Sequence, residues 1–319
     1  MRWCDICQRP WSFAYCGHPH PHRQPLPLLT SSSVPCATPA ILDRVYRELL
    51  AALPLLPSHR QALRQRGLAD VEILRRRYRT LPIAGRAALA NRLVAQIGAD
   101  LCAQVPGFYR AKRNGQCWWS LAGAAGLVIP VRDLDGHIVA LKVRADNAGA
   151  GPKYTTISSA KYGGPSPGAQ VHVPLSESVR GDTVRLTEGE LKSDIATALS
   201  RLLTISIPGV AMWRKALPVL EELRPQQVVL AFDADWRSNP HVAQALGHAA
   251  LALVKAGYEV QVEDWDPELG KGVDDLLASG HHPARRSPTL AFGAILRGQT
   301  RRGAGRMPTV AAGEVPSWR

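Results

Sequence analysis

Residues 228–235 read Val-Val-Leu-Ala-Phe-Asp-Ala-Asp, an apolar run that ends in two aspartates spaced two residues apart. A short apolar run of this kind predicts a buried strand, and strands buried on both faces are typical of parallel sheets. Open α/β sheets place their ligands at the carboxyl ends of the strands. Asp233 and Asp235 are therefore candidate site residues, and we expect both to point to one side of an extended segment, toward one divalent cation.

Short apolar runs alternate with helical patterns on both sides of this stretch. Strands are predicted at residues 183–187, 204–208, 228–232 and 258–262, with helices at 191–203, 217–223 and 241–256. Such alternation predicts a mostly parallel α/β sheet. The first of these strands also ends in acidic residues, Glu188-Gly189-Glu190. If it is a neighbour of the strand at 228–232, the two sets of carboxylates converge at one sheet edge.

A third acidic pair, Asp274-Asp275, follows Gly270-Lys271-Gly272-Val273 at the predicted start of a helix. Taken alone, any of these acidic residues fits a helix cap or an ordinary strand end. Three clusters in one α/β unit favour a metal site instead, because carboxylates packed together repel each other unless a cation neutralises them. Oxygen ligands of this kind suit Mg²⁺ or Mn²⁺.

The residues before this unit differ in pattern. Residues 39–105 have apolar side chains at helical spacing and are expected to form a helical segment. Residues 106–178 are richer in short strands, and Asp135-Gly136 between the apolar runs 126–132 and 137–144 predicts a β-hairpin. Residues 285–319 carry several arginines among glycine and proline and are expected to form a flexible basic tail.

The composition points to a polyanionic partner. The chain has 319 residues, of which 45% are hydrophobic, and 39 Lys and Arg against 26 Asp and Glu give a net charge of +13. Nucleic acid is the partner that this charge favours, although a coding bias toward arginine is an alternative. The apolar stretches are too short and too interrupted by proline to span a bilayer. With no signal peptide at the start, we expect a cytoplasmic protein without a membrane partner.

The six cysteines are expected to stay reduced in that compartment. Residues 1–27 have too little apolar content to build a core, so a metal would have to hold them together. Four tetrahedral ligands for Zn²⁺ are offered by Cys4, Cys7, Cys16 and His18, with His20, His22 and Cys36 as alternatives for the fourth. This zinc could be purely structural or part of a template-reading module. Cys102 and Cys117 are interpreted as buried thiols.

The segments Thr187-Glu188-Gly189, Phe232-Asp233-Ala234-Asp235 and Gly272-Val273-Asp274-Asp275 together resemble the Toprim domain of bacterial-type primases, topoisomerases and some nucleases. The resemblance implies a Rossmann-like α/β domain over residues 180–284. It implies that Glu188 lies nearest the reacting phosphate and that Asp233 and Asp235 hold the metal ions. Asp274 and Asp275 correspond to the last acidic pair, although the usual Asp-Pro-Asp is not reproduced. Lys271 either contacts a phosphate or is solvated.

Residues 106–178 are similar to the small basic subdomain that precedes Toprim in bacterial primases. The similarity is carried by Ile129-Pro-Val-Arg-Asp133, by the Asp135-Gly136 turn and by Pro152-Lys-Tyr-Thr-Thr-Ile-Ser-Ser159. It implies that template and nucleotide phosphates are guided by Arg132, Lys142, Arg144, Lys153 and Lys161. The alternative is that Arg132 pairs with Asp133 and Lys153 is merely exposed. Nearby aromatic residues either stack on unpaired bases or, as the favoured interpretation, pack in the core: Phe108, Tyr109, Trp118 and Trp119.

These resemblances imply a primase-like, metal-dependent nucleotidyltransferase of the phage or plasmid type, acting on a single-stranded DNA template with nucleoside triphosphates. The sequence contains no Gly-x-x-x-x-Gly-Lys-Ser/Thr loop, so a replicative helicase would be a separate chain. Two alternatives remain open, a Toprim nuclease and a non-catalytic DNA-binding replication accessory. A topoisomerase is disfavoured, because no tyrosine lies in an obvious strand-passing domain.

Overall fold

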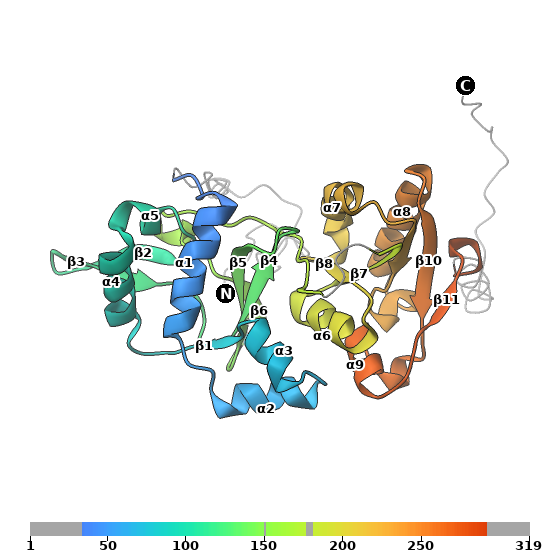
Figure 1. Ribbon diagram of the computed structural model, residues 1–319, viewed down its shortest axis with the longest axis horizontal. Helices are drawn as coiled ribbons and strands as arrows, with labels where there is room; N and C mark the ends of the chain where they lie inside the picture. Colours follow the sequence, from blue (N-terminus) through green and yellow to red (C-terminus); the bar gives the residue numbers. More distant parts are fainter. Residues whose placement is uncertain (1–33, 150, 177–180, 292–319) are drawn as a thin grey trace, which may run out of the picture.

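The computed structural model describes residues 34–149, 151–176 and 181–291 of the chain (Figure 1). An N-terminal unit of helices and antiparallel strands lies beside a C-terminal α/β unit. The zinc ligands expected at Cys4, Cys7, Cys16 and His18, with the alternatives His20 and His22, lie outside the described residues. Among the residues described, no helix is both long and apolar enough to cross a lipid bilayer.

The C-terminal unit is built on a five-stranded sheet in the order β11-β10-β9-β7-β8. The strands are β7 (Thr183–Glu188), β8 (Thr204–Ile207), β9 (Gln227–Leu230), β10 (Glu259–Asp264) and β11 (Ala284–Arg286). The four strands β7 to β10 pair in parallel, and β11 pairs antiparallel with β10. The mostly parallel α/β sheet predicted from the sequence is confirmed.

Helices cover both faces of this sheet. They are α6 (Glu190–Ser200), α7 (Ala216–Leu223), α8 (Pro240–Lys255) and α9 (Val273–Ala278). Side chains alternate along a strand, so β9 presents apolar groups to both sides, whereas β7 presents Val184 and Leu186 to one side and the buried Arg185 and Thr187 to the other. Leu186 and Leu230 pack with α7 and α8 on one face, whereas Ala231 packs with α6 and α9 on the other. This two-sided burial explains why residues 228–232 form a continuous apolar run.

The predicted tail does not begin at residue 285. Arg285 and Arg286 belong to β11, where their side chains lie 3.4 Å from Glu263 and 3.1 Å from Asp264 on β10. Ala291 is buried in the core of the C-terminal unit. The arginines read from the sequence as a loose basic run therefore include two that neutralise acidic residues at the sheet edge, and the residues beyond 291 are outside the described part.

The N-terminal unit contains a four-stranded sheet in the order β1-β4-β5-β6 and a separate two-stranded hairpin, β2-β3. The sheet strands are β1 (Arg79–Leu81), β4 (Gly126–Arg132), β5 (Ile138–Ala145) and β6 (Tyr154–Thr156); the hairpin strands are β2 (Phe108–Arg113) and β3 (Gln116–Leu121). β4 and β5 pair antiparallel across the Asp135-Gly136 turn, as the sequence predicts. In Figure 1 the β2-β3 hairpin lies at the end of the molecule far from the parallel sheet.

The helices of this unit are α1 (Pro39–Ala52), α2 (Pro57–Gln65), α3 (Asp70–Arg75), α4 (Arg86–Ile97) and α5 (Ala99–Ala103). Residues 39–105 are not purely helical, because β1 lies within them and pairs with β4. Nor do they have a core of their own. Leu49 on α1 and Leu93 on α4 share one apolar cluster with Leu141 on β5, since each amphipathic helix buries its apolar face against the sheet.

The two units are joined by an apolar cluster and by buried charges. Ile73 and Tyr78 from the N-terminal unit pack against Leu191 and Ile195 on α6. Within this contact the Asp194 carboxylate accepts hydrogen bonds from Arg76 Nε, at 2.9 Å, and from the Tyr78 hydroxyl. All three side chains are buried, so the relative placement of the units depends on this polar contact as well as on apolar packing.

The two cysteines interpreted as buried thiols differ. Cys102 on α5 is buried, and its burial raises the pKa of the thiol to about 11. Cys117 on β3 is exposed, so that part of the prediction is wrong. Its strand belongs to the two-stranded hairpin rather than to a covered sheet, which leaves the side chain open to solvent.

Candidate active site

The two acidic strand ends lie side by side. β7 and β9 are parallel neighbours, with Leu186 opposite Leu230, and Glu188 is the last residue of β7 while Asp233 follows β9 closely. The chain runs from β7 to β8 on one side and then returns to place β9 on the other side of β7. Ligand crevices of open α/β sheets form at such a reversal of strand order. The condition under which the sequence predicts converging carboxylates is therefore met.

Asp235 is not in an extended segment, contrary to the expectation. It lies in a 3-10 turn, η3 (Ala234–Arg237), in which the Trp236 side chain is buried against the core. Burial of Trp236 turns the chain away from the strand direction directly after Asp233. The two carboxylates still contact the same positive group, the ammonium of Lys271. Its Nζ lies 3.5 Å from Asp233 Oδ2 and 3.4 Å from Asp235 Oδ2.

A second ammonium group at this edge was missed in the sequence. Lys192 lies in the first turn of α6, and its Nζ donates to Asp233 Oδ1. Gly189, with a φ of +88°, lets the chain turn from β7 into α6. The available signal was the spacing Glu188-Gly-Glu-Leu-Lys192, which puts a lysine near the first acidic strand end.

The electrostatics of the edge reflect an excess of negative charge. Burial, followed by repulsion from Asp233, raises the pKa of the Glu188 carboxyl above its usual range. Attraction by Asp233 and then Asp235 raises the pKa of Lys271. Asp235 Oδ1 is buried and has no hydrogen-bond partner among the described residues. The site therefore attracts cations and leaves one carboxylate oxygen free for a further ligand.

The third acidic pair lies at the start of α9, as predicted. Asp274 is buried, and burial raises the pKa of its carboxyl although Arg66 opposes this effect. Arg66 Nη2 pairs with Asp274 Oδ2 and lies 3.6 Å from Asp275 Oδ1. A Cβ at Gly272 would collide with the Asp274 carboxylate and lie 3.2 Å from Lys192 Cε, so a larger residue there would have to displace one or both of these side chains. No sequence pattern pointed to Arg66, which is 208 residues away from Asp274.

The acidic edge faces cations of the N-terminal unit across a cavity of about 410 Å³. Lys142 on β5 holds Glu190 through both carboxylate oxygens, at 2.7 and 2.6 Å. Lys153 and Tyr154, at the start of β6, line the same cavity. The cavity is also lined by Arg66, Glu188, Asp233, Lys192, Lys271 and Asp275. A molecule in this cavity would contact carboxylates on one side and ammonium groups on the other.

The remaining predicted phosphate-binding residues are placed differently. The prediction for Arg132 is wrong: its side chain is 2% exposed, and Nη2 donates to the carbonyl oxygen of Arg76 at 2.8 Å rather than pairing with Asp133. Burial between the units removes it from any ligand in the cavity. Arg144 is opposite Tyr154 in the β5–β6 register but does not line the cavity. Lys161 is exposed, with Nζ over the ring of Tyr162.

The donor set at the sheet edge fits an oxygen-coordinated divalent cation. Glu188, Asp233 and Asp235 supply carboxylates, and the buried Asp235 Oδ1, which has no hydrogen-bond partner among the described residues, would be available to a metal ion. Lys192 and Lys271 partly neutralise the carboxylates in this arrangement.

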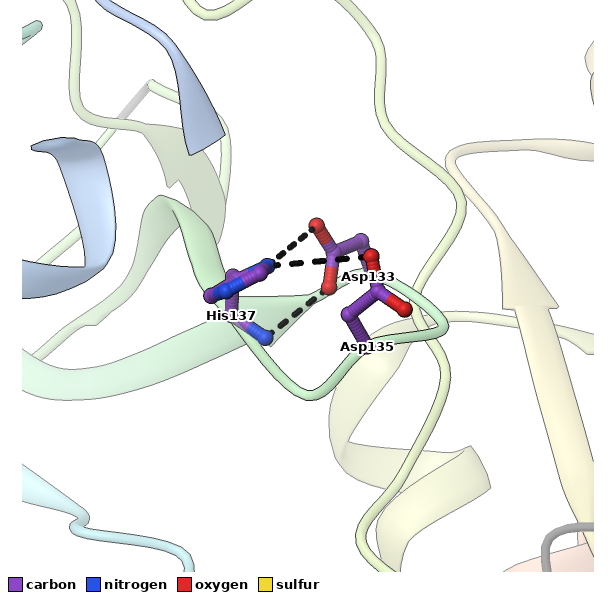
Figure 2. Close-up of side chains that lie close together, drawn as sticks. All are labelled: Asp133, Asp135 and His137. Carbon is purple, nitrogen blue, oxygen red and sulfur yellow. Dashed lines mark hydrogen bonds and ion pairs between the residues drawn. The ribbon is translucent and has the colours of Figure 1, made fainter. Parts of the chain in front are cut away.

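One tight group of ligand atoms within the described residues lies elsewhere, at Asp133, Asp135 and His137 in the β4–β5 turn (Figure 2). The backbone N–H of His137 donates to Asp133 Oδ1 at 2.8 Å, and the ring Nδ1 of His137 lies 3.4 Å from Asp133 Oδ2. These contacts close the hairpin turn, as aspartate side chains commonly do. The side chain of Asp135 is 76% exposed, so the turn itself accounts for the cluster.

Comparisons with known proteins add a family and a fold. Residues 179–283 match a family model described as a domain of unknown function, DUF3854. No curated protein matches the sequence. The match covers strands β7 to β10 of the C-terminal sheet but only a third of the chain, so it describes that unit alone.

Several solved structures are similar over most of the chain. The Aquifex aeolicus primase, with its zinc-binding and RNA polymerase domains, has a TM-score of 0.54 and 13% identity over 83% of this chain and 61% of that chain. A DnaG primase catalytic domain bound to single-stranded DNA has a TM-score of 0.56 and 16% identity over 81% and 78%.

The RNA polymerase domain of Mycobacterium tuberculosis primase DnaG, in complex with double-stranded DNA, has a TM-score of 0.58 and 16% identity over 81% of this chain and 80% of that chain. Each of these similarities includes both units and not only the parallel sheet, as the coverage requires. The chain therefore has the fold of the catalytic core of the bacterial DnaG primases, a Toprim-type α/β domain preceded by a mixed α+β subdomain.

Proposed function

We propose that this chain is a metal-dependent, primase-type nucleotidyltransferase that joins nucleotides on a single-stranded DNA template. The observation that carries the proposal is the shared cavity, in which Glu188 and Asp233 face Lys142 and Lys153 from the other unit. Phosphoryl transfer needs negative groups to hold a divalent cation and positive groups to hold phosphates. The fold shared with primase catalytic cores supports the same assignment.

In the proposed reaction, the oxygen of a 3′-hydroxyl attacks the α-phosphorus of a nucleoside triphosphate, and the bond to the leaving pyrophosphate breaks. Glu188, whose carboxyl pKa is raised by burial and by Asp233, accepts the hydroxyl proton. Lys153 and Lys271 bind and orient the phosphates. Asp233 and Asp235, with Asp274 and Asp275 beside them, would hold Mg²⁺ or Mn²⁺, which supplies neutralisation of the developing phosphate charge.

The test is synthesis by the full chain with single-stranded DNA, labelled ribonucleotides and Mg²⁺. Short oligomers are expected, and Asp233→Asn should reduce their yield by about 1,000-fold, the scale of losing one preorganised charged group. Asp182→Asn is the matched control, since this exposed aspartate precedes the opposite end of β7. Cleavage of the template would assign a nuclease instead. Binding of DNA without either reaction would assign a non-catalytic accessory.

The proposal extends to the N-terminal cysteines. Cys4, Cys7, Cys16 and His18 would hold one structural Zn²⁺, as the cysteine spacing predicts. The similar Aquifex aeolicus primase structure includes a zinc-binding domain, which supports this proposal. Metal analysis of the purified full chain should find about one zinc per chain, lost in a Cys4→Ser, Cys7→Ser variant. A Cys102→Ser variant, which changes a buried thiol of α5, should keep the zinc.

The biological setting is proposed from the sequence alone. A chain of this kind would act in the replication of a mobile genetic element, with a separate helicase opening the duplex. Its net charge of +13 suits a partner with a phosphate backbone. A synthesis assay on templates with and without an added replicative helicase would test the partnership by the change in primer yield.

A further inference from the structure

The β2-β3 hairpin has a surface that the proposed active site does not use. Its strands and turn, residues 108–121, contain three cations, Arg110, Lys112 and Arg113, and no acidic residue. All three side chains are exposed. None of them forms an ion pair with any carboxylate in the described part of the chain. Unpaired cations on a projecting hairpin create a positive potential that attracts a polyanion.

The pleat of the hairpin separates its aromatic residues onto two faces. Phe108 and Trp119 lie on one face, where they pack with the core of the N-terminal unit. Tyr109 and Trp118 lie on the other face with Arg113, since side chains alternate along each strand. Trp118 belongs to none of the apolar clusters formed by the described residues. Core packing, favoured in the sequence for all four aromatic residues, therefore explains only two of them.

A stacked pair of rings extends this second face. The rings of Tyr109 and Tyr162 are 3.7 Å apart and 7° from parallel, and Tyr162 is 43% exposed. Lys161 Nζ lies 4.8 Å from the Tyr162 ring. Trp118 is paired with Ala111 of β2. Ala111 lies two residues after Tyr109, which corresponds to about 7 Å along the strand. Two aromatic platforms thus lie close together with cations on either side.

We propose that this hairpin face, formed by Tyr109, Arg113, Trp118, Lys161 and Tyr162, binds single-stranded DNA away from the catalytic cavity. The proposal rests on the proposed function in one respect, which is that the bound single strand is the template DNA. Tyr162 is exposed and Tyr109 and Trp118 are partly exposed, and such rings with neighbouring cations suit unpaired bases, whose flat faces stack while the phosphates contact ammonium and guanidinium groups. Paired bases in a duplex offer no free ring face to such platforms.

The chain connects the hairpin face to the cavity. Lys153 and Tyr154 line the cavity at the start of β6, and the chain then runs through β6 to the 3-10 turn η1 (Ala160–Tyr162), which contacts β2. Lys161 and Tyr162 belong to that turn. A DNA strand that leaves the cavity along β6 therefore arrives at Tyr162. The Lys161 ammonium can then move from the Tyr162 ring to a phosphate of the DNA.

The experiment measures binding of labelled oligodeoxythymidylates to the full chain, without nucleotides or divalent metal, by fluorescence anisotropy. For an oligomer of about 20 nucleotides, Trp118→Ala should weaken binding about tenfold, within the range for one stacked base. Arg113→Ala should lower the slope of log affinity against log salt by about 0.7, the value for one phosphate contact on a single strand. Trp118→Phe should restore the affinity but not the quenching of tryptophan fluorescence by DNA.

Lys255→Ala is the control, because this exposed lysine lies on α8 in the other unit and has no ion pair among the described residues. If Trp118→Ala and Arg113→Ala bind no more weakly than Lys255→Ala, the proposal is overturned. Equal competition by duplex DNA would also overturn it. Repeating the measurement in the Asp233→Asn background separates the two proposals, because DNA binding at the hairpin does not need catalysis. If the wild type synthesises primers but the hairpin variants bind DNA as tightly as it does, only the proposal for the hairpin face is refuted.

Discussion

At the scale of single residues, the charge of Glu188 lowers the stability of the folded protein. Glu188 is partly buried beside Asp233, so its ionised form lacks water and meets a like charge. Lys192 and Lys271 offset this repulsion only in part, since the pKa of Glu188 remains raised. Sites that hold strained charge are typical of function rather than of stable packing.

Replacing Glu188 by Gln should therefore stabilise the protein while abolishing synthesis. The carboxyl pKa is raised above its ordinary 4.5, so folding favours the protonated group and loses that advantage as pH rises through the raised value. The melting temperature of the variant should exceed that of the wild type by a few degrees at pH 7.5. The gap should close toward pH 4.5, measured by circular dichroism.

The exposed Glu222 on α7 provides the control for this comparison, since Glu222→Gln removes the same charge without a buried neighbour. Its melting temperature should follow that of the wild type at both pH values. A Glu188→Gln protein that melts below the wild type at pH 7.5 would contradict the account of repulsion at this edge.

At the scale of elements, α6 is the helix that joins the two units to the site. Glu190 and Asp194 lie four residues apart, on one face, and pair with Lys142 and Arg76 of the N-terminal unit. Lys192, on a different side of the helix, reaches Asp233. The position of α6 therefore sets the distance between the cationic wall and the acidic edge.

Asp194→Asn should loosen this junction. Burial raises the pKa of the Asp194 carboxyl, but the proximity of His172 and Arg76 outweighs burial and holds the pKa well below its ordinary value of 3.8. The stability that Asp194 contributes is thus present above pH 3.8 and lost as pH falls through the folded pKa. At neutral pH the variant should lose about 3 kcal/mol of unfolding free energy in urea, because the buried Arg76 loses one of its two carboxylate partners and keeps only Glu72.

The exposed Asp182 serves as the comparison, because Asp182→Asn changes the same group outside any buried pair. That variant should unfold within about 0.5 kcal/mol of the wild type, as surface substitutions do. An Asp194→Asn protein with wild-type stability would show that apolar packing of Ile73, Tyr78 and Leu191 holds the units together without the buried charge.

At the scale of the whole molecule, the charged groups of the cavity come from both units. Glu188, Asp233 and Asp235 lie at strand ends of the C-terminal sheet, where Lys192 and Lys271 partly neutralise them, whereas Lys142 and Lys153 come from the N-terminal unit. Neither unit forms the cavity alone. A ligand that bridges the two charge sets would stabilise the folded chain as a whole by linkage.

Mg²⁺ should raise the melting temperature of the wild type and leave Asp233→Asn almost unchanged. A concentration about 100 times the dissociation constant corresponds to about 2.7 kcal/mol of stabilisation. Differential scanning fluorimetry with and without a chelator would measure the shift. Equal shifts in the two proteins would mean that the metal binds away from the sheet edge, for example at Asp133 and Asp135 in the β4–β5 turn.

Local patterns in the sequence were sufficient for the elements and for the acidic half of the site. The apolar runs of β7 and β9, the Asp135-Gly136 turn and the carboxylates after each strand depend on neighbouring residues alone, so periodicity and turn preference predict them. They do not reveal that β1 lies within the helical segment, because a strand of three residues has too short a pattern.

Tertiary structure alone decided which charges meet. Arg66 reaches Asp274 across 208 residues, Lys192 turns toward Asp233, and Arg132 is drawn into the junction between the units instead of the cavity. An isolated arginine or lysine has the same local signature whether it binds phosphate or closes a buried contact. Its partner is chosen by the packing of separate units, where burial makes an unpaired charge costly, and that choice is made only when the chain is folded.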